Sequence, residues 1–197
     1  IVGGGLMGCV TSWHLAQAGM DVAIVDRGGL CMGASGVNAG TLSIQIKRAS
    51  LIPYALRGWE LWRSTGERFG IDIDFHQKGG LTLAFTDEEA EMMETRMADR
   101  RAAGAPIEMM TGTAIGNIEP GLDTEKIVLA AYCPMDGYAN SSISGRVYRQ
   151  ALKNAGATLF ENAPVTTIDH DDAGFIVHCS TGTIISAKQI VLAGGAW

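Results

Sequence analysis

Residues 1–26 read IVGGGLMGCVTSWHLAQAGMDVAIVD, and this stretch decides how the rest of the chain is organised. Its first two residues are typical of the end of a buried strand, and the glycines after them have the spacing G-x-G-x-x-G at Gly3, Gly5 and Gly8. Apolar residues then recur at roughly helical spacing until Gly19, which stands where a helix is capped. A second strand over residues 22–25 ends on Asp26. This order of strand, glycines, helix, strand and acid predicts a βαβ unit of the kind that binds dinucleotides.

The glycine motif has a physical explanation if a dinucleotide binds to it. Gly3 permits a tight turn, Gly5 lets the backbone approach a pyrophosphate, and Gly8 lets the helix pack closely against the strand. The helix N-terminus, at Leu6 and Met7, offers free N–H groups and a partial positive charge to the phosphates. Glycine turns are common and the chain has 26 glycines, so the alternative is a βαβ unit whose turn binds nothing.

Asp26 is the residue that we expect to bind the ribose hydroxyls. It lies 18 residues after Gly8, close to the separation of about 20 that this acid has in dinucleotide-binding folds. Its carboxylate would repel a ribose 2′-phosphate, which makes NADP the least favoured ligand.

Residues 27–42 form a glycine-rich loop in place of the second crossover helix that a nicotinamide-binding domain would have. Small side chains and exposed N–H groups suit a long ligand that lies against the backbone, and Ser35 and Asn38 can donate hydrogen bonds to it. The alternative is an ordinary solvent loop, but its position directly after the glycine motif favours one shared site. Lys47 and Arg48 follow in the sequence and could receive a substrate carboxylate, although solvated charges beside a helix are the commoner explanation.

Composition argues against several classes of protein. With 47% hydrophobic residues, the 197-residue chain can form one globular domain or two small ones. A net charge of −6 argues against a nucleic-acid-binding surface, and no apolar stretch approaches the roughly 18 residues of a membrane helix. The four cysteines are far apart and the histidines are scattered, so neither a metal site nor a disulfide framework is predicted. A reducing, cytoplasmic location is the default expectation.

Both ends of the sequence predict a piece of a longer protein. The chain has no initiator Met, its first strand is too short to be complete, and residues 189–193 read as a buried strand four residues before Trp197.

Helices and strands alternate over the rest of the chain. Thr86 with Glu89 predicts a capping box for a helix through Ala103. Its methionines are expected in the core, at positions Met92, Met93 and Met97. Helices are predicted over residues 50–69, 86–103 and 142–156, and strands over residues 79–85, 127–132, 158–161, 165–170, 175–179 and 189–193.

Taken together, these motifs resemble the FAD-dependent D-amino acid oxidase family, which includes glycine oxidase, sarcosine oxidase and the bacterial D-amino acid and opine dehydrogenases. The resemblance covers essentially the whole chain. It rests on the order and spacing of five short motifs, at residues 1–8, 33–40, 79–81, 136–138 and 191–197.

The resemblance implies an α/β fold: a Rossmann-like, three-layer FAD-binding domain with an inserted part of an α+β substrate domain. We expect residues 1–78 to form the first part of the FAD-binding domain and residues 136–197 to continue it. Residues 79–135 would form part of the substrate domain, from antiparallel strands and a helix.

The resemblance also implies where FAD binds, either noncovalently or through a link outside this chain. The loop at Ser35 would lie along the pyrophosphate, the backbone at Val165 near the adenine, and Gly194 and Gly195 on the other side of the nucleotide. A basic pair matching Lys47 and Arg48 lies near the flavin and the substrate carboxylate in sarcosine-oxidase-like members, and here its first residue is Lys rather than Arg. The predicted cofactor-binding residues are Gly3, Gly5, Leu6, Met7, Gly8, Asp26, Arg27, Ala34, Ser35, Asn38, Ala39, Gly40, Val165, Ala193, Gly194, Gly195 and Trp197.

The implied reaction oxidises the C–N bond of a small amino acid or secondary amine by hydride transfer to the flavin. Glycine, sarcosine, a D-amino acid or an opine would be the substrate, oxygen or an electron carrier the acceptor, and the protein could form homo- or hetero-oligomers. Two alternatives stay open: an NAD-dependent dehydrogenase that uses the same fingerprint, and a subunit that binds FAD without catalysis.

Overall fold

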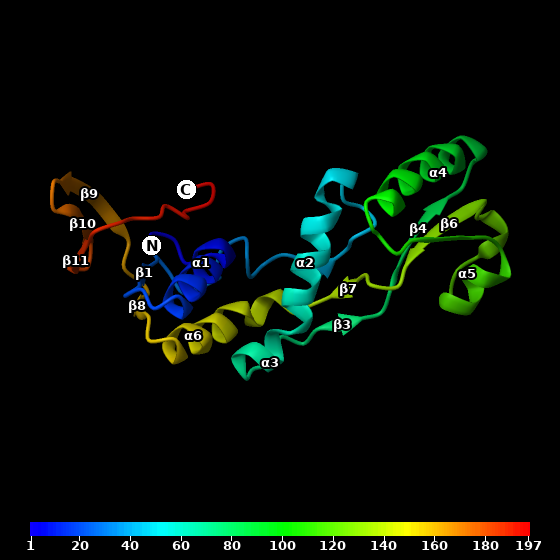
Figure 1. The fold of residues 1–197 in the computed structure, drawn as a ribbon. Helices are drawn as coiled ribbons and strands as arrows, with labels where there is room; N and C mark the ends of the chain where they lie inside the picture. Colours follow the sequence, from blue (N-terminus) through cyan, green and yellow to red (C-terminus); the bar gives the residue numbers. More distant parts are fainter. The chain divides into compact units, whose positions relative to one another are not determined.

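The computed structural model describes residues 1–197 and divides into two compact units. Figure 1 shows the ribbon of the chain, with labels on most of its helices and strands. The first unit comprises residues 1–39, 65–73 and 140–197, and the second comprises residues 40–64 and 74–139.

Parallel strands form the centre of the first unit. Val2 makes parallel bridges to Val25 on one side and to Leu192 on the other. Strand β1 (Ala23–Val25) pairs in parallel with β8 (Thr158–Phe160). Helix α1 (Leu6–Gln17) connects Val2 to β1, so the chain begins with the predicted βαβ unit. The α/β fold class is therefore confirmed, and the glycine motif directly follows Val2, which lies between Val25 and Leu192.

Two layers cover these parallel strands. Helix α1 lies beside α6 (Ser144–Asn154), and the two helices contact β1 and β8 (Figure 1). An antiparallel sheet in the order β11-β10-β9 contributes Val177 and Cys179 to a core that includes Val25. The strands of this sheet are β9 (Val165–Asp171), β10 (Gly174–Cys179) and β11 (Ile184–Ala187).

The second unit contains an antiparallel sheet in the order β4-β6-β5. Helix α4 (Asp87–Ala102) packs beside it through Met93 and Met97, which are buried in the same core as Ile44 and Ile52. The sheet consists of β4 (Gly80–Ala84), β5 (Glu108–Met110) and β6 (Leu129–Cys133). The remaining elements are β2 (Thr41–Leu42), β3 (His76–Gln77), β7 (Gly137–Tyr138), α5 (Thr113–Ile118) and the short 3-10 helices η1 (Ala49–Leu51) and η2 (Thr124–Lys126).

The predicted helix over residues 50–69 is wrong in one respect, because it is two helices. Helix α2 (Ile52–Arg63) ends at Ser64, whose ψ is 4° and whose hydroxyl donates to Leu61 O. Helix α3 (Thr65–Phe69) then belongs to the first unit. The ring of Phe69 packs there against Trp13 and Tyr148 at centroid distances of 5.1 and 5.5 Å. Aromatic packing in the first unit therefore competes with continuation of the helix.

Two other predicted helices lie at the expected residues but differ in burial or in the first turn. Thr86 caps α4 as predicted: its hydroxyl accepts from Glu89 N, and the Glu89 carboxylate accepts from Phe85 N. Met92, predicted in the core, is instead 44% exposed, since the buried stripe of α4 passes through its neighbour. The predicted helix over residues 142–156 begins as η3 (Ser141–Ile143) and continues as α6.

The predicted buried strand over residues 189–193 is also wrong. Only Leu192 forms a bridge, and its side chain is 69% exposed. The bridge holds through two backbone hydrogen bonds, from Val2 N to Val191 O and from Ala193 N to Val2 O. This segment pairs with Val2 through its backbone, while the Leu192 side chain faces solvent.

The compact units and the predicted domains differ in three stretches. Residues 40–64, 74–78 and 136–139 belong to the second unit, whereas the sequence predicts them in the FAD-binding domain. The domain functions themselves stay predictions. None of the helices combines the length and the apolar composition that crossing a membrane requires.

Candidate functional site

The three glycines of the motif have three different surroundings. Gly3 has φ +108°, and a Cβ placed there would overlap Ala193 O. A Cβ at Gly8 would overlap Gly3 O, so helix and strand backbones are in direct contact. A Cβ at Gly5 would meet only the Ser35 hydroxyl, at 3.3 Å. Gly3 and Gly8 are therefore required by the fold, and Gly5 leaves open the space that a pyrophosphate needs.

Asp26 ends β1 beside this turn. One carboxylate oxygen accepts from Gly4 N at 2.6 Å, and the other accepts from Gly28 N at 2.8 Å. Its backbone oxygen accepts from Ala163 N at 2.9 Å, which ties the segment after β8 to the end of β1. Each carboxylate oxygen has further acceptor capacity, so both can also accept from sugar hydroxyls. The acid lies beside the glycine motif, and its contact with ribose stays a prediction.

The loop after β1 returns to the N-terminus of α1. Cys31 N donates to Gly4 O at 2.7 Å, and Leu6 N donates to the Ser35 hydroxyl at 2.9 Å. Because Ser35 accepts from Leu6, its own hydrogen remains for a ligand. The structure therefore brings Ser35 together with the glycine motif, as the sequence predicts for one shared site.

The rest of this loop holds its own conformation. The Asn38 amide group donates to Ala34 O and Ser35 O at 3.2 and 2.8 Å, so its N–H groups bind the loop rather than pointing outward. Ala39 ends this part of the first unit, and Gly40 begins the second with φ +71°. These bonds fix the loop that carries Ser35, and the contact of Asn38 with the cofactor stays a prediction.

The C-terminal segment adjoins the motif on its other side. Ala193 contacts both Gly3 and Gly8, and the N–H of Trp197 donates to Gly194 O at 3.3 Å. The Arg27 guanidinium lies over the Trp197 ring, 4.1 Å from its centroid. Three other predicted residues lie elsewhere in the first unit. Gly195 has φ +68°, and Met7 is 71% exposed in the first turn of α1. Val165 begins β9 and packs against the core that includes Val25.

Lys47 and Arg48 lie in the second unit, exposed, just before η1. Lys47 O accepts from Arg100 Nε at 2.7 Å, which fixes the backbone and leaves the Lys47 ammonium in solvent. The neighbouring segment is fixed by Asp136, which is 2% exposed. Its carboxylate accepts from the Ser43 hydroxyl at 2.5 Å, from Ile44 N at 2.7 Å and from the Gln45 amide at 3.1 Å.

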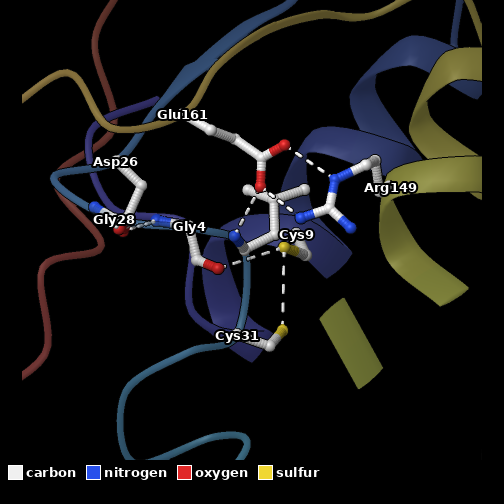
Figure 2. Close-up of polar contacts among 8 residues, drawn as sticks. Gly4, Cys9, Asp26, Gly28, Cys31, Arg149 and Glu161 are labelled. Carbon is white, nitrogen blue, oxygen red and sulfur yellow. Dashed lines mark hydrogen bonds and ion pairs between the residues drawn. The ribbon is translucent and has the colours of Figure 1, made fainter. Parts of the chain in front are cut away.

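An ion pair that is absent from the predicted site lies next to the glycine motif. Arg149 of α6 donates through Nε and Nη2 to Glu161, at 2.7 and 2.5 Å (Figure 2). The hydrogen bonds from Arg149 lower the pKa of the Glu161 carboxyl, and the same interaction raises the pKa of Arg149. Glu161 follows β8 as Asp26 follows β1, and this position at the carboxyl end of a parallel strand was the available signal.

Two of the four free thiols also meet behind the turn. The Sγ atoms of Cys9 and Cys31 are 4.0 Å apart, and Cys9 Sγ donates to Gly4 O at 3.3 Å (Figure 2). The hydrogen bond with Cys31 and the burial of both groups raise the pKa of the Cys9 thiol. Cys9 therefore stays protonated and packs as a small apolar side chain.

Comparison with known proteins places the chain in a family. The family model described as FAD dependent oxidoreductase matches residues 1–197. Glycine oxidase from Geobacillus kaustophilus is 34% identical over 204 residues, which cover 100% of this chain and 54% of the relative. An opine oxidase subunit from Rhizobium meliloti is 30% identical, with 99% of this chain and 55% of the relative covered.

A solved structure agrees with the sequence comparison. The crystal structure of glycine oxidase from Geobacillus kaustophilus superposes with a TM-score of 0.88 at 33% identity, covering 100% of this chain and 54% of that chain. The chain thus spans about half the length of these relatives. Because the family model matches every residue, the chain belongs to the DAO family of FAD-dependent oxidoreductases, as its motifs predict.

Proposed function

We propose that this chain binds FAD, with the pyrophosphate against the turn at Gly5 and the ribose at Asp26. The observation that carries the proposal is the contrast among the glycines. Gly3 and Gly8 face backbone atoms, whereas the position at Gly5 is closed only by the Ser35 hydroxyl. The cofactor of the family is FAD, and the residues at this turn fit its pyrophosphate.

We further propose that the protein oxidises the C–N bond of a small amino acid or secondary amine. Relatives that are named as a glycine oxidase, an opine oxidase subunit and a dimethylglycine dehydrogenase support this substrate class. When bound, the flavin supplies the acceptor for a hydride from the carbon beside the amine, and water hydrolyses the resulting imine. The contribution of this chain is to bind and orient the cofactor. The groups that would do so are the N–H groups at the start of α1, the Ser35 hydroxyl and the Asp26 carboxylate.

Lys47 and Arg48 are the proposed cations for the substrate carboxylate. Both are exposed, and the backbone that carries them is held by Asp136 and Arg100. A fixed backbone favours a specific contact because less freedom is lost when a ligand binds. The test is the Michaelis constant of the Arg48→Ala variant, which should rise for a carboxylate substrate and stay unchanged for an amine without a carboxylate.

The function is tested by the visible spectrum of the protein purified from its complete gene. A flavin spectrum that bleaches without oxygen on addition of glycine, sarcosine, proline or a D-amino acid supports the proposal. A colourless protein that binds NAD contradicts it. Consumption of oxygen during turnover separates an oxidase from a dehydrogenase that uses an electron carrier.

A second candidate is an FAD-holding subunit that needs a partner, which the similarity to one subunit of opine oxidase favours. Such a protein would retain flavin without bleaching on its own. Light scattering measures the oligomeric state of the protein, expressed alone or together with the products of neighbouring genes. If substrate bleaches the flavin only in a hetero-oligomer, this candidate is selected.

A further inference from the structure

The carboxylate of Glu161 joins three segments of the first unit. Oε1 accepts from Leu30 N at 2.8 Å and from Arg149 Nη2 at 2.5 Å, and Oε2 accepts from Arg149 Nε at 2.7 Å (Figure 2). It therefore links the end of β8, helix α6 and the loop after β1. The Arg149 and Glu161 side chains are 36% and 21% exposed, so water screens this pair less than an ordinary surface pair.

The backbone at Leu30 and Cys31 forms a fixed corner of that loop. The Leu30 side chain is 1% exposed, and a Cβ at Gly145 of α6 would overlap Leu30 O. Cys31 has φ +55°, a conformation that residues other than glycine adopt only where their surroundings impose it. Its N–H is bound to Gly4 O, while the preceding N–H is bound to Glu161. The corner is thus held on one side by the glycine motif and on the other by Glu161.

The corner determines where Ser35 lies. The loop folds back so closely that a Cβ at Gly36 would overlap Cys31 O, and Gly36 N donates to Gly33 O at 2.9 Å. Ser35, immediately before Gly36, then accepts from Leu6 N at 2.9 Å. Hydrogen bonds and backbone contacts therefore connect Glu161 continuously with the first turn of α1.

We propose that Glu161 is a positioning residue for FAD. It does not contact the proposed pyrophosphate position itself. It acts through the Leu30–Cys31 corner, which places the Ser35 hydroxyl over the start of α1. This inference rests on the proposed FAD site and adds to it a residue whose contribution is the conformation of the loop. A purely structural ion pair would stabilise the fold and leave the affinity for FAD unchanged.

The test compares Glu161→Ala, Glu161→Gln and Arg149→Ala in the protein made from its complete gene. The flavin is removed, and the dissociation constant for FAD is measured from the quenching of flavin fluorescence. Glu161→Ala should weaken FAD binding by about tenfold, the scale of a lost hydrogen bond to a charged group. Glu161→Gln should restore most of the affinity, because its amide oxygen can still accept from Leu30 N.

Arg149→Ala separates positioning from the ion pair. It removes the ion pair completely but leaves the bond between Leu30 N and Glu161. Its loss of FAD affinity should therefore be clearly smaller than that of Glu161→Ala, while the thermal midpoints of the two flavin-free variants fall by similar amounts. Glu60→Ala is the matched control, because Glu60 pairs with Arg57 at an exposed site far along the sequence, and it should change neither quantity.

Hydrogen exchange gives a readout that does not depend on flavin. In flavin-free Glu161→Ala, the amides of residues 28–36 should exchange faster than in the parent, and in Glu161→Gln they should exchange almost as slowly as in the parent.

Equal FAD affinity for parent and Glu161→Ala, or equal losses for Glu161→Ala and Arg149→Ala, would overturn the positioning role alone. A parent that takes up no FAD would overturn the proposed function and this inference with it. If Glu161→Ala does not fold, Glu161→Leu, whose side chain has no acceptor for Leu30 N, takes its place in the same comparisons.

Discussion

Gly8 tests the packing of the βαβ unit at the scale of one residue. Gly8→Ala places a methyl group against Gly3 O, a backbone atom that cannot move aside without shifting the strand. We expect the free energy of unfolding to fall by about 1–3 kcal/mol, the usual cost of overpacking. Gly58→Ala in α2 is the control, since no atom lies within 4 Å of its Cβ position, and it should gain about 0.5–1 kcal/mol from helix propensity. An unchanged urea midpoint for Gly8→Ala would mean that helix and strand are not in contact.

Asp26 combines a structural and a proposed ligand-binding contribution. Asp26→Ala removes the acceptor for both Gly4 N and Gly28 N, and FAD binding should weaken by about 10- to 100-fold, as expected for hydrogen bonds to a charged group. Asp26→Asn keeps one good acceptor and should lose less. Equilibrium titration of the flavin-free variants measures both constants, and parent-like affinity in Asp26→Ala would show that the acid is misassigned.

Local sequence is sufficient to predict the positions of Gly8 and Asp26 in the fold. It is insufficient to predict which distant residues contact this region. The glycine motif and Asp26 could be placed because a βαβ unit fixes their relative positions within 26 residues. Glu161 could not, because the residues joined by its bond to Leu30 are 131 positions apart. Asn38 shows another limit: the bonds from its amide to Ala34 O and Ser35 O could not be inferred from the sequence, and its contact with the cofactor stays a prediction.

At the scale of elements, the N-terminus of α4 offers a test that should leave the cofactor untouched. Thr86→Ala removes the hydroxyl that accepts from Glu89 N, and the unfolding free energy should fall by about 1 kcal/mol. FAD affinity should stay at the parent value because α4 belongs to the second unit. Chemical denaturation followed by circular dichroism checks the first value, and a stability equal to the parent would show that the cap contributes nothing.

The link between β8 and α6 should depend on pH in a defined direction. Arg149 lowers the pKa of Glu161 below its usual value of 4.5, so the folded state binds this proton less readily than the unfolded state. The stabilisation is therefore complete above pH 4.5 and disappears as the pH falls through the lowered pKa. The difference in unfolding free energy between parent and Glu161→Gln should shrink over that range, as measured by urea unfolding at several pH values. A difference that grows towards acid would contradict the assignment.

Element prediction succeeded where the signal is local and failed where distant packing decides. The capping box of α4 and the two strands β9 and β10 follow directly from neighbouring residues. The break at Ser64 depends on the packing of Phe69 against Trp13, which no helical periodicity reports. Strand β5 and helix α5 are absent from the sequence prediction, because each has few residues and no strong pattern.

At the scale of the whole molecule, the sequence predicted the class of fold, the family and a first domain interrupted by a second, but not the boundaries of the compact units. The chain passes between the units near residues 39, 64, 73 and 139, and the second of these points coincides with the end of helix α2. The passage at residue 39 lies inside a glycine-rich loop that reads as one continuous site. Composition does not change at these points, so the boundaries could be found only from packing.

The most direct test of the account is the flavin content of Gly5→Val, measured from the visible spectrum of the protein purified from its complete gene. The side chain of valine would enter the space beside Ser35 that we assign to the pyrophosphate. We expect a folded Gly5→Val protein without bound FAD, while the Gly58→Ala control keeps the flavin content of the parent. A Gly5→Val protein that carries as much FAD as the parent would contradict the central claim that this turn holds the cofactor.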